Sequence, residues 1–356
     1  MSFLPTDLIL VTGANGHLAQ HVVDQLLALP NPPRVRGTVR SLDKATPIFK
    51  HYPRQVDQGL LEIVVVEDIT TPGAFDEAIK GATHLAHVAA PISTQQNDIE
   101  TDILQPAIAG TTSALETALH EPSVRKVVVT STFASCVDPS KGWRPDYTHT
   151  EADFNPLTRE DAINTDLSLP NCVPLLRPWV PYMVAKLLAE KAAWEIASRP
   201  DAHFGLTVCL PTYIFGPSIL PLEKGAGSLN YSNGVIWSIA NAQGAEHMPI
   251  VGPQWADVRD VARAHVLALS KKEVDGQRFL LYAGPYYNSD IAEIVKKHFP
   301  TLSPSTGPSQ KFDHYRIDNS KSINTLGLGS YISLEQSVID TLIQILAQER
   351  KPQDSN

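Results

Sequence analysis

The chain has 356 residues, of which 43% are hydrophobic and 19% charged, and its formal net charge is −9. This length suits one large domain with a hydrophobic core, or one domain with a smaller lobe. The acidic balance excludes a protein that follows a nucleic-acid backbone, and no apolar run is long enough to span a bilayer. We therefore expect a soluble protein with a small-molecule partner, no nucleic acid and no membrane.

The N-terminal stretch MSFLPTDLILVTG lacks the basic segment, long apolar segment and small-residue cleavage site of a signal peptide. The three cysteines, Cys136, Cys172 and Cys209, are widely separated and lack metal-ligand spacing. An odd number of scattered cysteines is typical of reduced thiols inside the cell. Both observations predict a cytoplasmic protein with structural cysteines.

The first two hundred residues alternate short apolar runs with amphipathic, helix-length segments. Strands are predicted at 8–11, 34–39, 61–66, 83–90 and 124–131. A helix over about 180–198 then leads into a sixth strand at 205–211. Strands separated by helix-length segments need crossover connections, which place helices on both faces of a parallel sheet. The pattern predicts an α/β fold with a Rossmann-type doubly wound parallel sheet.

The stretch VTGANGHLAQHVV follows the first strand and opens the first helix. Its Gly13, Gly16 and Ala19 form a GxxGxxA pattern, in which the glycines allow a tight turn and close approach to a pyrophosphate. The small Ala19 lets the helix pack on the strand. We expect a dinucleotide site at this loop. Its residues are Gly13, Asn15, Gly16, His17 and Leu18.

The end of the second strand, VRGTVRSLDKA, indicates which nicotinamide cofactor is bound. A site for NAD usually has an acid here for the ribose 2′-hydroxyl, whereas a site for NADP has arginine for the 2′-phosphate. This strand is followed by Arg40 and, four residues later, by Lys44. The pattern favours NADPH, and the nearby Asp43 leaves some tolerance of NADH open.

A hydroxyl cluster and a Tyr–Lys pair are the candidate catalytic groups. Thr130, Ser131 and Thr132 fall at the carboxyl end of a buried strand, the edge where open α/β sheets bind ligands. Tyr182 is the only one of ten tyrosines with a lysine, Lys186, four residues later, so both share one helix face. An adjacent ammonium favours the phenolate and would lower the tyrosine pKa from about 10. Tyr182 can then serve as the acid in a carbonyl reduction.

The second half of the chain is richer in loops. We assign 1–211 mainly to an NADP(H)-binding domain, with a proline-rich insert at 138–180. A smaller substrate-binding lobe is expected mainly over 212–348, with segments such as 258–270 returning to the core, because such sheets build their substrate crevice from late loops. The residues 349–356 have the composition of a disordered tail.

At this point a family resemblance is specific. The stretches VTGANGHLAQHVV, VRGTVRSLDKA, VVEDIT, HVAAP, VVVTSTFAS, YMVAK, LPTYIFGP and DVRDVARAHVLAL have the order and approximate spacing of the extended short-chain dehydrogenase/reductases. The chain looks most similar to the branch with dihydroflavonol reductases, cinnamoyl-CoA reductases and fungal NADPH-dependent aldehyde and ketone reductases of the methylglyoxal type. The resemblance covers about residues 5–345.

The resemblance implies roles for individual residues. It makes Tyr182 the proton donor, and Lys186 both its partner and a ligand of the nicotinamide ribose. The third catalytic group is Thr132, and Ser131 is the alternative for that role. It places Asp68 and Ile69 at the adenine. It also places Arg40 and Lys44 at the 2′-phosphate, Ala89 and Ala90 along the cofactor, and Pro211 and Thr212 near the nicotinamide amide.

Several other residues receive different interpretations. We expect no metal site, because His84 and His87 lie in a strand without HxxH or HExxH spacing. Acids such as Asp257 and Asp260, at the start of a helix with Arg259 between them, usually cap it. The substrate wall is expected at residues flanking the catalytic positions and late loops. These are Phe133, Met183, Tyr213 and Trp237.

Together these patterns predict an NADPH-dependent reductase of a ketone or aldehyde, of the kind found in secondary metabolism. A hydroxysteroid-type dehydrogenase and a non-catalytic NADP(H)-sensing regulator stay open as alternatives. Arg40 and Lys44 argue against an epimerase with tightly held NAD⁺, and a dehydratase would favour acids after Thr132, where Phe133 and Ala134 stand. The oligomeric state, monomer or homodimer, stays open.

Overall fold

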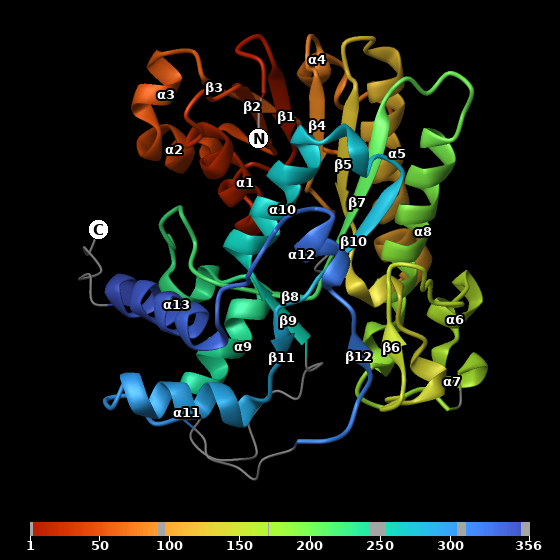
Figure 1. Ribbon diagram of the computed structural model, residues 1–356, viewed down its shortest axis with the longest axis vertical. Helices are drawn as coiled ribbons and strands as arrows, with labels where there is room; N and C mark the ends of the chain where they lie inside the picture. Colours follow the sequence, from red (N-terminus) through yellow and green to blue (C-terminus); the bar gives the residue numbers. More distant parts are fainter. Residues whose placement is uncertain (1–2, 92–96, 170, 242–253, 305–310, 350–356) are drawn as a thin grey trace.

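The structure is a computed structural model that describes residues 3–91, 97–169, 171–241, 254–304 and 311–349. Its centre is a seven-stranded parallel sheet (Figure 1). In spatial order the strands are β3 (Leu61–Val65), β2 (Arg34–Val39), β1 (Leu8–Val11), β4 (His84–His87), β5 (Lys126–Thr130), β7 (Gly205–Pro211) and β10 (Gln277–Leu281).

The first six strands of the sheet confirm the predicted doubly wound Rossmann fold. Their order, taken along the chain, is 3-2-1-4-5-6, and β7 is the predicted sixth strand. β10 then adds a seventh strand beside β7, with Phe279 opposite Cys209. The C-terminal part of the chain therefore returns to complete the central sheet.

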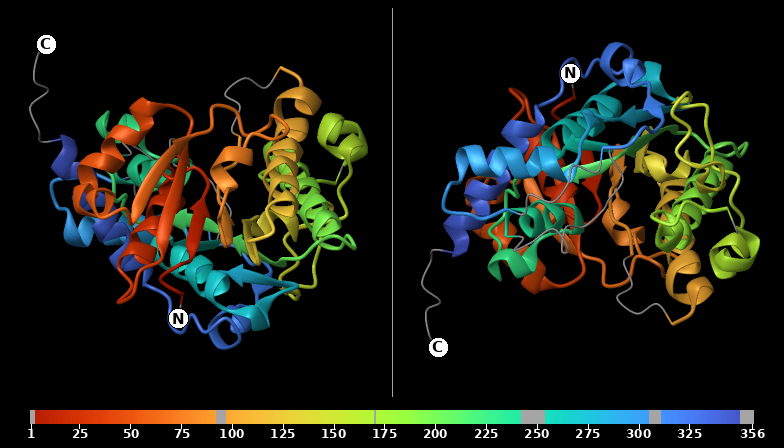
Figure 2. Two further views of the ribbon diagram at one scale, coloured as in Figure 1. Left: turned by 90° about the horizontal axis from the view of Figure 1, so that it is seen from above. Right: turned by 90° about the horizontal axis from the view of Figure 1, so that it is seen from below.

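Helices cover both faces of this sheet. Along β1, Leu8 and Leu10 face one core cluster while Ile9 and Val11 face another, because successive side chains of a strand point to opposite faces. α5 (Gln105–His120) and α8 (Val180–Ala197) pack together on the first face (Figure 2). α1 (His17–Leu27) and α10 (Val258–Ser270) pack together on the second. Shorter helices accompany the first strands: α2 (Leu42–His51), α3 (Pro53–Asp57) and α4 (Asp76–Ile79).

A smaller lobe lies beyond the carboxyl ends of the strands (Figure 1). Its sheet has the order β11 (Gly284–Pro285), β9 (Gln254–Asp257) and β8 (Tyr213–Phe215). The helices of the lobe are α9 (Tyr231–Ala240), α11 (Asn288–His298) and α13 (Leu334–Glu349). A third core cluster, with Phe215, Ile236 and Leu342 at its centre, holds them together.

The insert and the C-terminal segment pair with each other. β6 (Thr148–His149) forms a parallel pair with β12 (Arg316–Ile317), and the insert also holds α6 (Arg159–Ile163) and α7 (Thr165–Ser168). α12 (Ser320–Asn324) follows β12. Short 3-10 and π segments lie at Glu100–Leu104, Phe133–Ser135, Pro139–Lys141, Arg177–Trp179, Gly225–Ser228 and Lys272–Val274.

Of the predicted tail, residue 349 is the last residue of α13, and 350–356 lie outside the described residues. Among the helices of the described ranges, none combines the length and the hydropathy that a bilayer span requires.

Candidate active site

The turn between β1 and α1 requires glycine at its first position. Gly13 has a φ of +68°, in the left-handed region that residues with a side chain rarely adopt. A Cβ on Gly13 would also lie 3.1 Å from the Cβ of Ala89, which follows β4. Both the backbone angle and the close neighbour therefore exclude a larger residue here.

Two threonine hydroxyls hold this turn in place. The Oγ1 of Thr12 accepts hydrogen bonds from the amides of Val88 (3.0 Å) and Ala89 (2.9 Å). The Gly13 amide donates to the Oγ1 of Thr38 in β2, at 3.1 Å. The carboxyl ends of β1, β2 and β4 are thus tied together at one edge of the sheet. Sequence reasoning missed both threonines, although Thr12 stands directly before the glycine turn.

No side chain of the residues that the structure describes caps the N-terminus of α1. Gly16 occupies the N-cap position, and a Cβ there would lie 3.1 Å from the carbonyl oxygen of Gly13. The next residues anchor the helix, because Leu18 and Ala19 are buried in the core. Without a capping side chain, the first amides of the helix can bind an anion.

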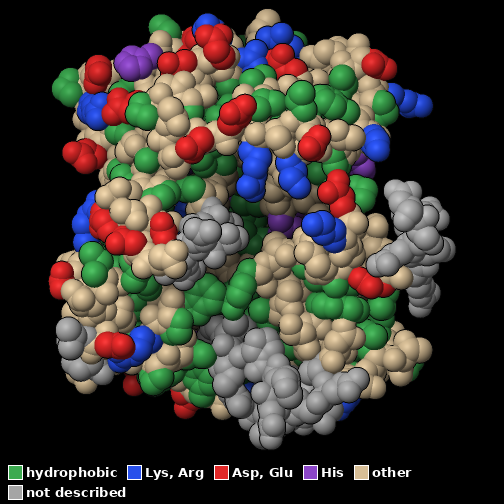
Figure 3. Space-filling view, turned by 180° about the vertical axis from the view of Figure 1, so that it is seen from behind, with side chains coloured by type: hydrophobic (Ala, Val, Ile, Leu, Met, Phe, Trp, Pro, Cys, Tyr) green, Lys and Arg blue, Asp and Glu red, His purple; other side chains and the backbone are tan. Residues whose placement is uncertain are grey.

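The predicted cations lie at the same edge of the sheet. Arg40 and Lys44 are exposed, and within the described ranges neither forms an ion pair. Lys44, Asn15 and His17 line one cavity of about 250 Å³. The Nε2 of His17 is buried without a hydrogen-bond partner among the described residues, and burial lowers the pKa of His17 to about 3. Figure 3 shows one face of the molecule hollowed at its centre, with Lys and Arg side chains at the rim.

The residues expected at the adenine follow β3, the edge strand beyond β2. The carboxylate of Asp68 accepts hydrogen bonds from the amide (2.9 Å) and the hydroxyl (2.7 Å) of Thr70, and these bonds lower the pKa of Asp68. The Cδ1 of Ile69 would lie 3.3 Å from a Cβ on Gly110 of α5. Ala90, next to Ala89, is exposed at the end of β4. These residues share the sheet edge of the glycine turn.

The predicted catalytic residues also come together. Tyr182 lies in the first turn of α8, and its side chain is 43% exposed. The buried Thr132, which follows β5, lies close enough for its hydroxyl to act on the phenol of Tyr182. One helical turn further along α8, the Nζ of Lys186 donates to the carbonyl oxygen of Thr130, at 2.8 Å. α8 therefore sets both residues against the end of β5.

The pKa of Tyr182 differs from the expectation. Although the ring is 43% exposed, burial around the phenolic oxygen raises the pKa of Tyr182, and the neighbouring Thr132 hydroxyl lowers it only in part. The ammonium of Lys186 is hydrogen-bonded to the Thr130 carbonyl rather than directed at the phenol. Burial lowers the pKa of Lys186 to about 8, although Glu190 opposes that shift. At neutral pH the phenol is protonated and the lysine is mostly charged.

The neighbouring hydroxyl of Ser131 has a different environment. It donates to the carboxylate of Glu190 at 2.5 Å, inside the core and away from Tyr182. The Oγ1 of Thr132 instead donates to the carbonyl oxygen of Pro211 at 3.4 Å, and this hydroxyl lowers the pKa of Tyr182. The geometry favours Thr132 over Ser131 as the partner of the tyrosine.

Pro211 and Thr212 stand at the end of β7, next to this catalytic group. Pro211 is buried, and its carbonyl oxygen accepts from Thr132. The Oγ1 of Thr212 donates to the carbonyl oxygen of Leu281 at 3.1 Å, which ties the end of β7 to the end of β10. Strands β5, β7 and β10 therefore end together beside Tyr182.

The four expected substrate-wall residues lie in different surroundings. Phe133 and Met183 are 4% and 2% exposed and belong to the first core cluster. Trp237 packs against the third core cluster. Tyr213 is half-buried and lies within 6.3 Å of the ring of Tyr231. The burial of Phe133 and Met183 in the core argues against a substrate contact for them, whereas Tyr213 and Trp237 stay predicted substrate residues.

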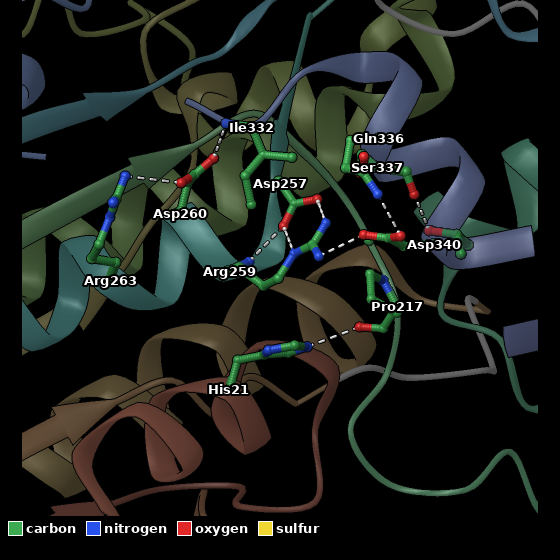
Figure 4. Close-up of polar contacts among 12 residues, drawn as sticks. His21, Pro217, Asp257, Arg259, Asp260, Arg263, Ile332, Gln336, Ser337 and Asp340 are labelled. Atoms are coloured by element: carbon green, nitrogen blue, oxygen red, sulfur yellow. Dashed lines mark hydrogen bonds and ion pairs between the residues drawn. The ribbon is translucent and has the colours of Figure 1, made fainter. Parts of the chain in front are cut away.

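The start of α10 has a structural role, as predicted. Asp257 caps the helix by accepting from the Arg259 amide at 2.9 Å, and the Arg259 guanidinium bridges Asp257 and Asp340 of α13 (Figure 4). The carboxylate of Asp260 accepts from the amide of Ile332 at 2.7 Å. These contacts join α10 to the C-terminal segment.

The two strand histidines are buried and neutral. Burial lowers the pKa of His84 to about 4 and that of His87 to about 3. The Nδ1 of His87 lies 3.2 Å from the Oγ1 of Thr12, so this histidine helps to fix the threonine that precedes the glycine turn. Among the described residues no group of three or more His, Cys, Asp or Glu could hold a metal ion. The three cysteines are free and buried.

Comparison with known proteins identifies the family. The pattern of the NAD dependent epimerase/dehydratase family matches residues 9–281. The chain belongs to this family. The match confirms the resemblance to extended short-chain dehydrogenase/reductases that the motifs predicted.

Members of the family with assigned activities are similar over nearly the whole chain. The ketoreductase azaE of Aspergillus niger is 34% identical, over 96% of this chain and 98% of its own. The NADPH-dependent methylglyoxal reductase GRE2 of Saccharomyces cerevisiae is 31% identical, again over 96% and 98%. The crystal structure of Gre2 from Candida albicans in complex with NADPH has a TM-score of 0.85 and 33% identity, and the match covers 97% of this chain and 100% of that one.

Proposed function

We propose that this protein is an NADPH-dependent reductase of a ketone or aldehyde group in a small molecule. One observation carries the proposal: Thr132, at the end of β5, lies close enough to Tyr182 for its hydroxyl to lower the pKa of the phenol, and Lys186 lies one helical turn from Tyr182. The activities named for the ketoreductase and the methylglyoxal reductase support it. A metabolite of the secondary type, a cytoplasmic location and a monomeric or homodimeric state stay predictions.

The residues at the glycine turn fit NADPH. The amides at the uncapped start of α1 suit the pyrophosphate, since a helix N-terminus attracts anions. His17, whose Nε2 has no hydrogen-bond partner in the described part of the chain, lines the same cavity as Lys44, so an incoming polar group would satisfy it. Arg40 and Lys44 would hold the 2′-phosphate. Asp68, Ile69, Ala89, Ala90, Pro211 and Thr212 would line the rest of the cofactor.

The catalytic residues then act on the substrate carbonyl. Bound NADPH supplies a hydride to the carbonyl carbon. Tyr182 donates its phenolic proton to the carbonyl oxygen as negative charge develops there. The hydroxyl of Thr132 donates a second hydrogen bond to the same oxygen. Lys186, charged below pH of about 8, stabilises the phenolate that remains and binds the nicotinamide ribose.

The protonation state of Tyr182 is compatible with its role as the proton donor of a reduction. A phenol whose pKa is raised above 10 holds its proton at neutral pH, as a proton donor must. Oxidation of an alcohol would need the phenolate instead. The intact Tyr182–Lys186 pair counts against a regulator without catalysis, and a hydroxysteroid-type dehydrogenase stays an alternative.

Replacement of the proton donor tests the proposal. Tyr182→Phe should lower kcat for NADPH oxidation with a carbonyl substrate by about 10²–10⁴-fold, the usual contribution of a general acid. The Kd for NADPH should stay within about threefold, because only the hydroxyl is removed. Stopped-flow absorbance gives kcat, and titration of cofactor fluorescence gives Kd.

Tyr147→Phe is the matched control, because its hydroxyl bonds Asp153 in the insert, outside the catalytic group. It should keep full activity. Retained turnover in Tyr182→Phe would refute the assignment of the proton donor. Tight NADPH binding by the wild-type protein without reduction of any ketone or aldehyde would favour the regulator.

A further inference from the structure

A loop of the smaller lobe forms part of the cavity beside the glycine turn. This loop, 217–223, follows β8 and contributes to the same lining as Asn15, His17 and Lys44. Its lining residues are Ser218, Leu220, Pro221, Leu222 and Glu223. Among the described residues of the lining, none belongs to the catalytic group of Thr132, Tyr182 and Lys186. The loop therefore belongs to the cofactor end of the site, although the smaller lobe supplies it.

Gln20 of α1 holds this loop from the domain of the central sheet. Its Oε1 accepts hydrogen bonds from the amides of Ile219 (2.9 Å) and Leu220 (2.6 Å). Its Nε2 donates to the Oγ of Ser218 at 2.9 Å. The Gln20 side chain is buried, so the amide group finds these partners in the loop instead of water. One buried side chain thus fixes three successive loop residues on α1.

Gln344 of α13 holds the same loop from the smaller lobe. Its Oε1 accepts from the amide of Ser218 and its Nε2 donates to the carbonyl oxygen of Ser218, both at 2.6 Å. His21, next to Gln20 on α1, donates to the carbonyl oxygen of Pro217 at 2.8 Å (Figure 4). Gln344 is not one of the described residues that line the cavity. Any effect of Gln344 on a ligand there therefore passes through the loop.

Two polar atoms at this cavity lack hydrogen-bond partners within the described ranges. They are the Nε2 of His17 on α1 and the Oδ1 of Asn233 on α9, and both residues line the cavity. Asn233 is 2% exposed, and its Nδ2 donates to the carbonyl oxygen of Gly216 at 2.7 Å, which fixes the orientation of the amide group. Because buried polar atoms need partners, the cavity is suited to a polar ligand that contacts both lobes.

We propose that Gln20 and Gln344 are positioning residues for NADPH binding, because they hold the loop 217–223 as the wall that the smaller lobe adds to the cofactor site. This inference rests on the proposed function, since that function places NADPH at this cavity. Bound NADPH and the two glutamines then favour the same position of the loop. A loop that occupies this position in only a fraction of the molecules weakens NADPH binding by that fraction. Hydride transfer from bound NADPH is unaffected, because the catalytic group lies outside the cavity.

Gln344→Met tests the inference most directly, since methionine keeps the length of the side chain and removes both hydrogen bonds to Ser218. The Kd for NADPH should rise about tenfold, which corresponds to a loop that holds its position in about a tenth of the molecules. The kcat with methylglyoxal or butane-2,3-dione at saturating NADPH should stay within about twofold, as for a loss of binding alone. Titration of cofactor fluorescence gives Kd, and NADPH oxidation gives kcat.

Gln20→Met should have the same signature, because it releases the loop from the other side. Each variant has a matched glutamine on its own helix. Gln336 of α13 is exposed and bonds Asp340, and Gln25 of α1 donates to the carbonyl oxygen of Arg259. Gln336→Met and Gln25→Met should leave the Kd for NADPH within about twofold, since neither side chain contacts the loop.

Hydrogen exchange of the loop gives a readout other than activity. In the wild-type protein, saturating NADPH should slow exchange at the amides of Ile219 and Leu220, because the cofactor favours the held position. In Gln344→Met without cofactor these amides should exchange faster, and saturating NADPH should restore most of the protection. Mass spectrometry of peptides that cover 217–223 measures both effects.

The outcomes separate this inference from the proposed function. A wild-type Kd for NADPH in both Gln20→Met and Gln344→Met would overturn the inference, and so would loop exchange that does not respond to NADPH in the wild-type protein. An equal rise of Kd in Gln344→Met and Gln336→Met would indicate a general effect on α13 and overturn it as well. In each of these cases NADPH binding and carbonyl reduction by the wild-type protein would leave the reductase intact. If the wild-type protein does not bind NADPH, both proposals fail.

Discussion

At the catalytic end of the candidate site charged side chains are buried and bonded, whereas at the cofactor end they are exposed. Glu190 and Arg278, behind Tyr182, are 1% and 6% exposed. Arg40 and Lys44, beside the glycine turn, are exposed, and in the described part of the chain they form no ion pair. A buried charge must find its partner inside the fold, but an exposed cation can take its partner from a ligand.

The buried pair explains how the catalytic end is fixed. The Nε of Arg278 donates to one carboxylate oxygen of Glu190 at 2.6 Å. The other oxygen accepts from Ser131 (2.5 Å) and Ser135 (3.0 Å), the residues on either side of the turn that holds Thr132. Because Glu190 follows Lys186 by one turn of α8, the same carboxylate also acts on that lysine. Buried charges therefore position the catalytic residues, whereas the exposed charges at the cofactor end remain available to bind a ligand.

The largest effect is expected on stability, when the buried Arg278–Glu190 pair is broken. Arg278→Met leaves the Glu190 carboxylate without its cation inside the core, which should cost about 3–5 kcal/mol of the free energy of unfolding. Urea denaturation of the variant and the wild-type protein measures the difference. The double variant Arg278→Met, Glu190→Leu should recover part of the loss, because it removes both charges.

Arg199→Met is the matched control on the surface. Arg199 pairs with Glu116, and both side chains are about 40% exposed. Exposed ion pairs contribute little to stability, so this variant should be nearly as stable as the wild-type protein. If both arginine variants lost the same stability, the buried pair would not have the special role that we assign to it.

A smaller effect is expected at the exposed cations. Arg40→Ala and Lys44→Ala should each weaken NADPH binding by about 10–100-fold, since a hydrogen bond to a charged group is worth about 1.5–3 kcal/mol. The Kd for NADH, which lacks the 2′-phosphate, should stay within about twofold. Titration of cofactor fluorescence measures both constants.

Lys50→Ala, an exposed lysine at the other end of α2, serves as the control for net charge. It should leave both constants nearly unchanged. Binding of NADPH by the wild-type protein should also weaken with salt more than that by Arg40→Ala, because the lost interaction is ionic. Equal losses for NADPH and NADH in Arg40→Ala would contradict the assignment of the 2′-phosphate.

The smallest effect is a shift in pH dependence at the catalytic end. Burial lowers the pKa of Lys186 to about 8, so its ammonium is present below that pH and is lost as the pH rises through it. The raised pKa of Tyr182 keeps the proton donor intact over the same range. The kcat for reduction should therefore fall above pH of about 8, and a kcat profile between pH 6 and 10 measures this limb.

Lys186→Arg should move the limb to higher pH, because a guanidinium stays charged throughout this range. NADPH binding over the same pH values separates a loss of catalysis from a loss of cofactor. A limb that keeps its position in Lys186→Arg would assign the titration to another group.

The sequence predicted the parts of the site that lie within one element or at one strand end. Tyr182 and Lys186 share a helix face because they are four residues apart, and this relation does not depend on how the helix packs against its neighbours. Gly13 was predicted because a turn between a strand and a helix at a phosphate site needs a positive φ. The doubly wound strand order could be predicted from the alternation of strands and helices, because βαβ crossovers allow few arrangements.

The tertiary structure decided which residues from distant segments meet. Arg278 pairs with Glu190 across 88 residues, and Trp179 meets Tyr231 from another lobe. It also decided between neighbours, since Ser131 faces Glu190 while Thr132 faces Tyr182. Periodicity along one strand or helix fixes local faces only, whereas partners and desolvation depend on how several elements pack. The sequence by itself therefore determined the fold class and the catalytic helix, and only the packing decided the buried ion pair and the pKa of the proton donor.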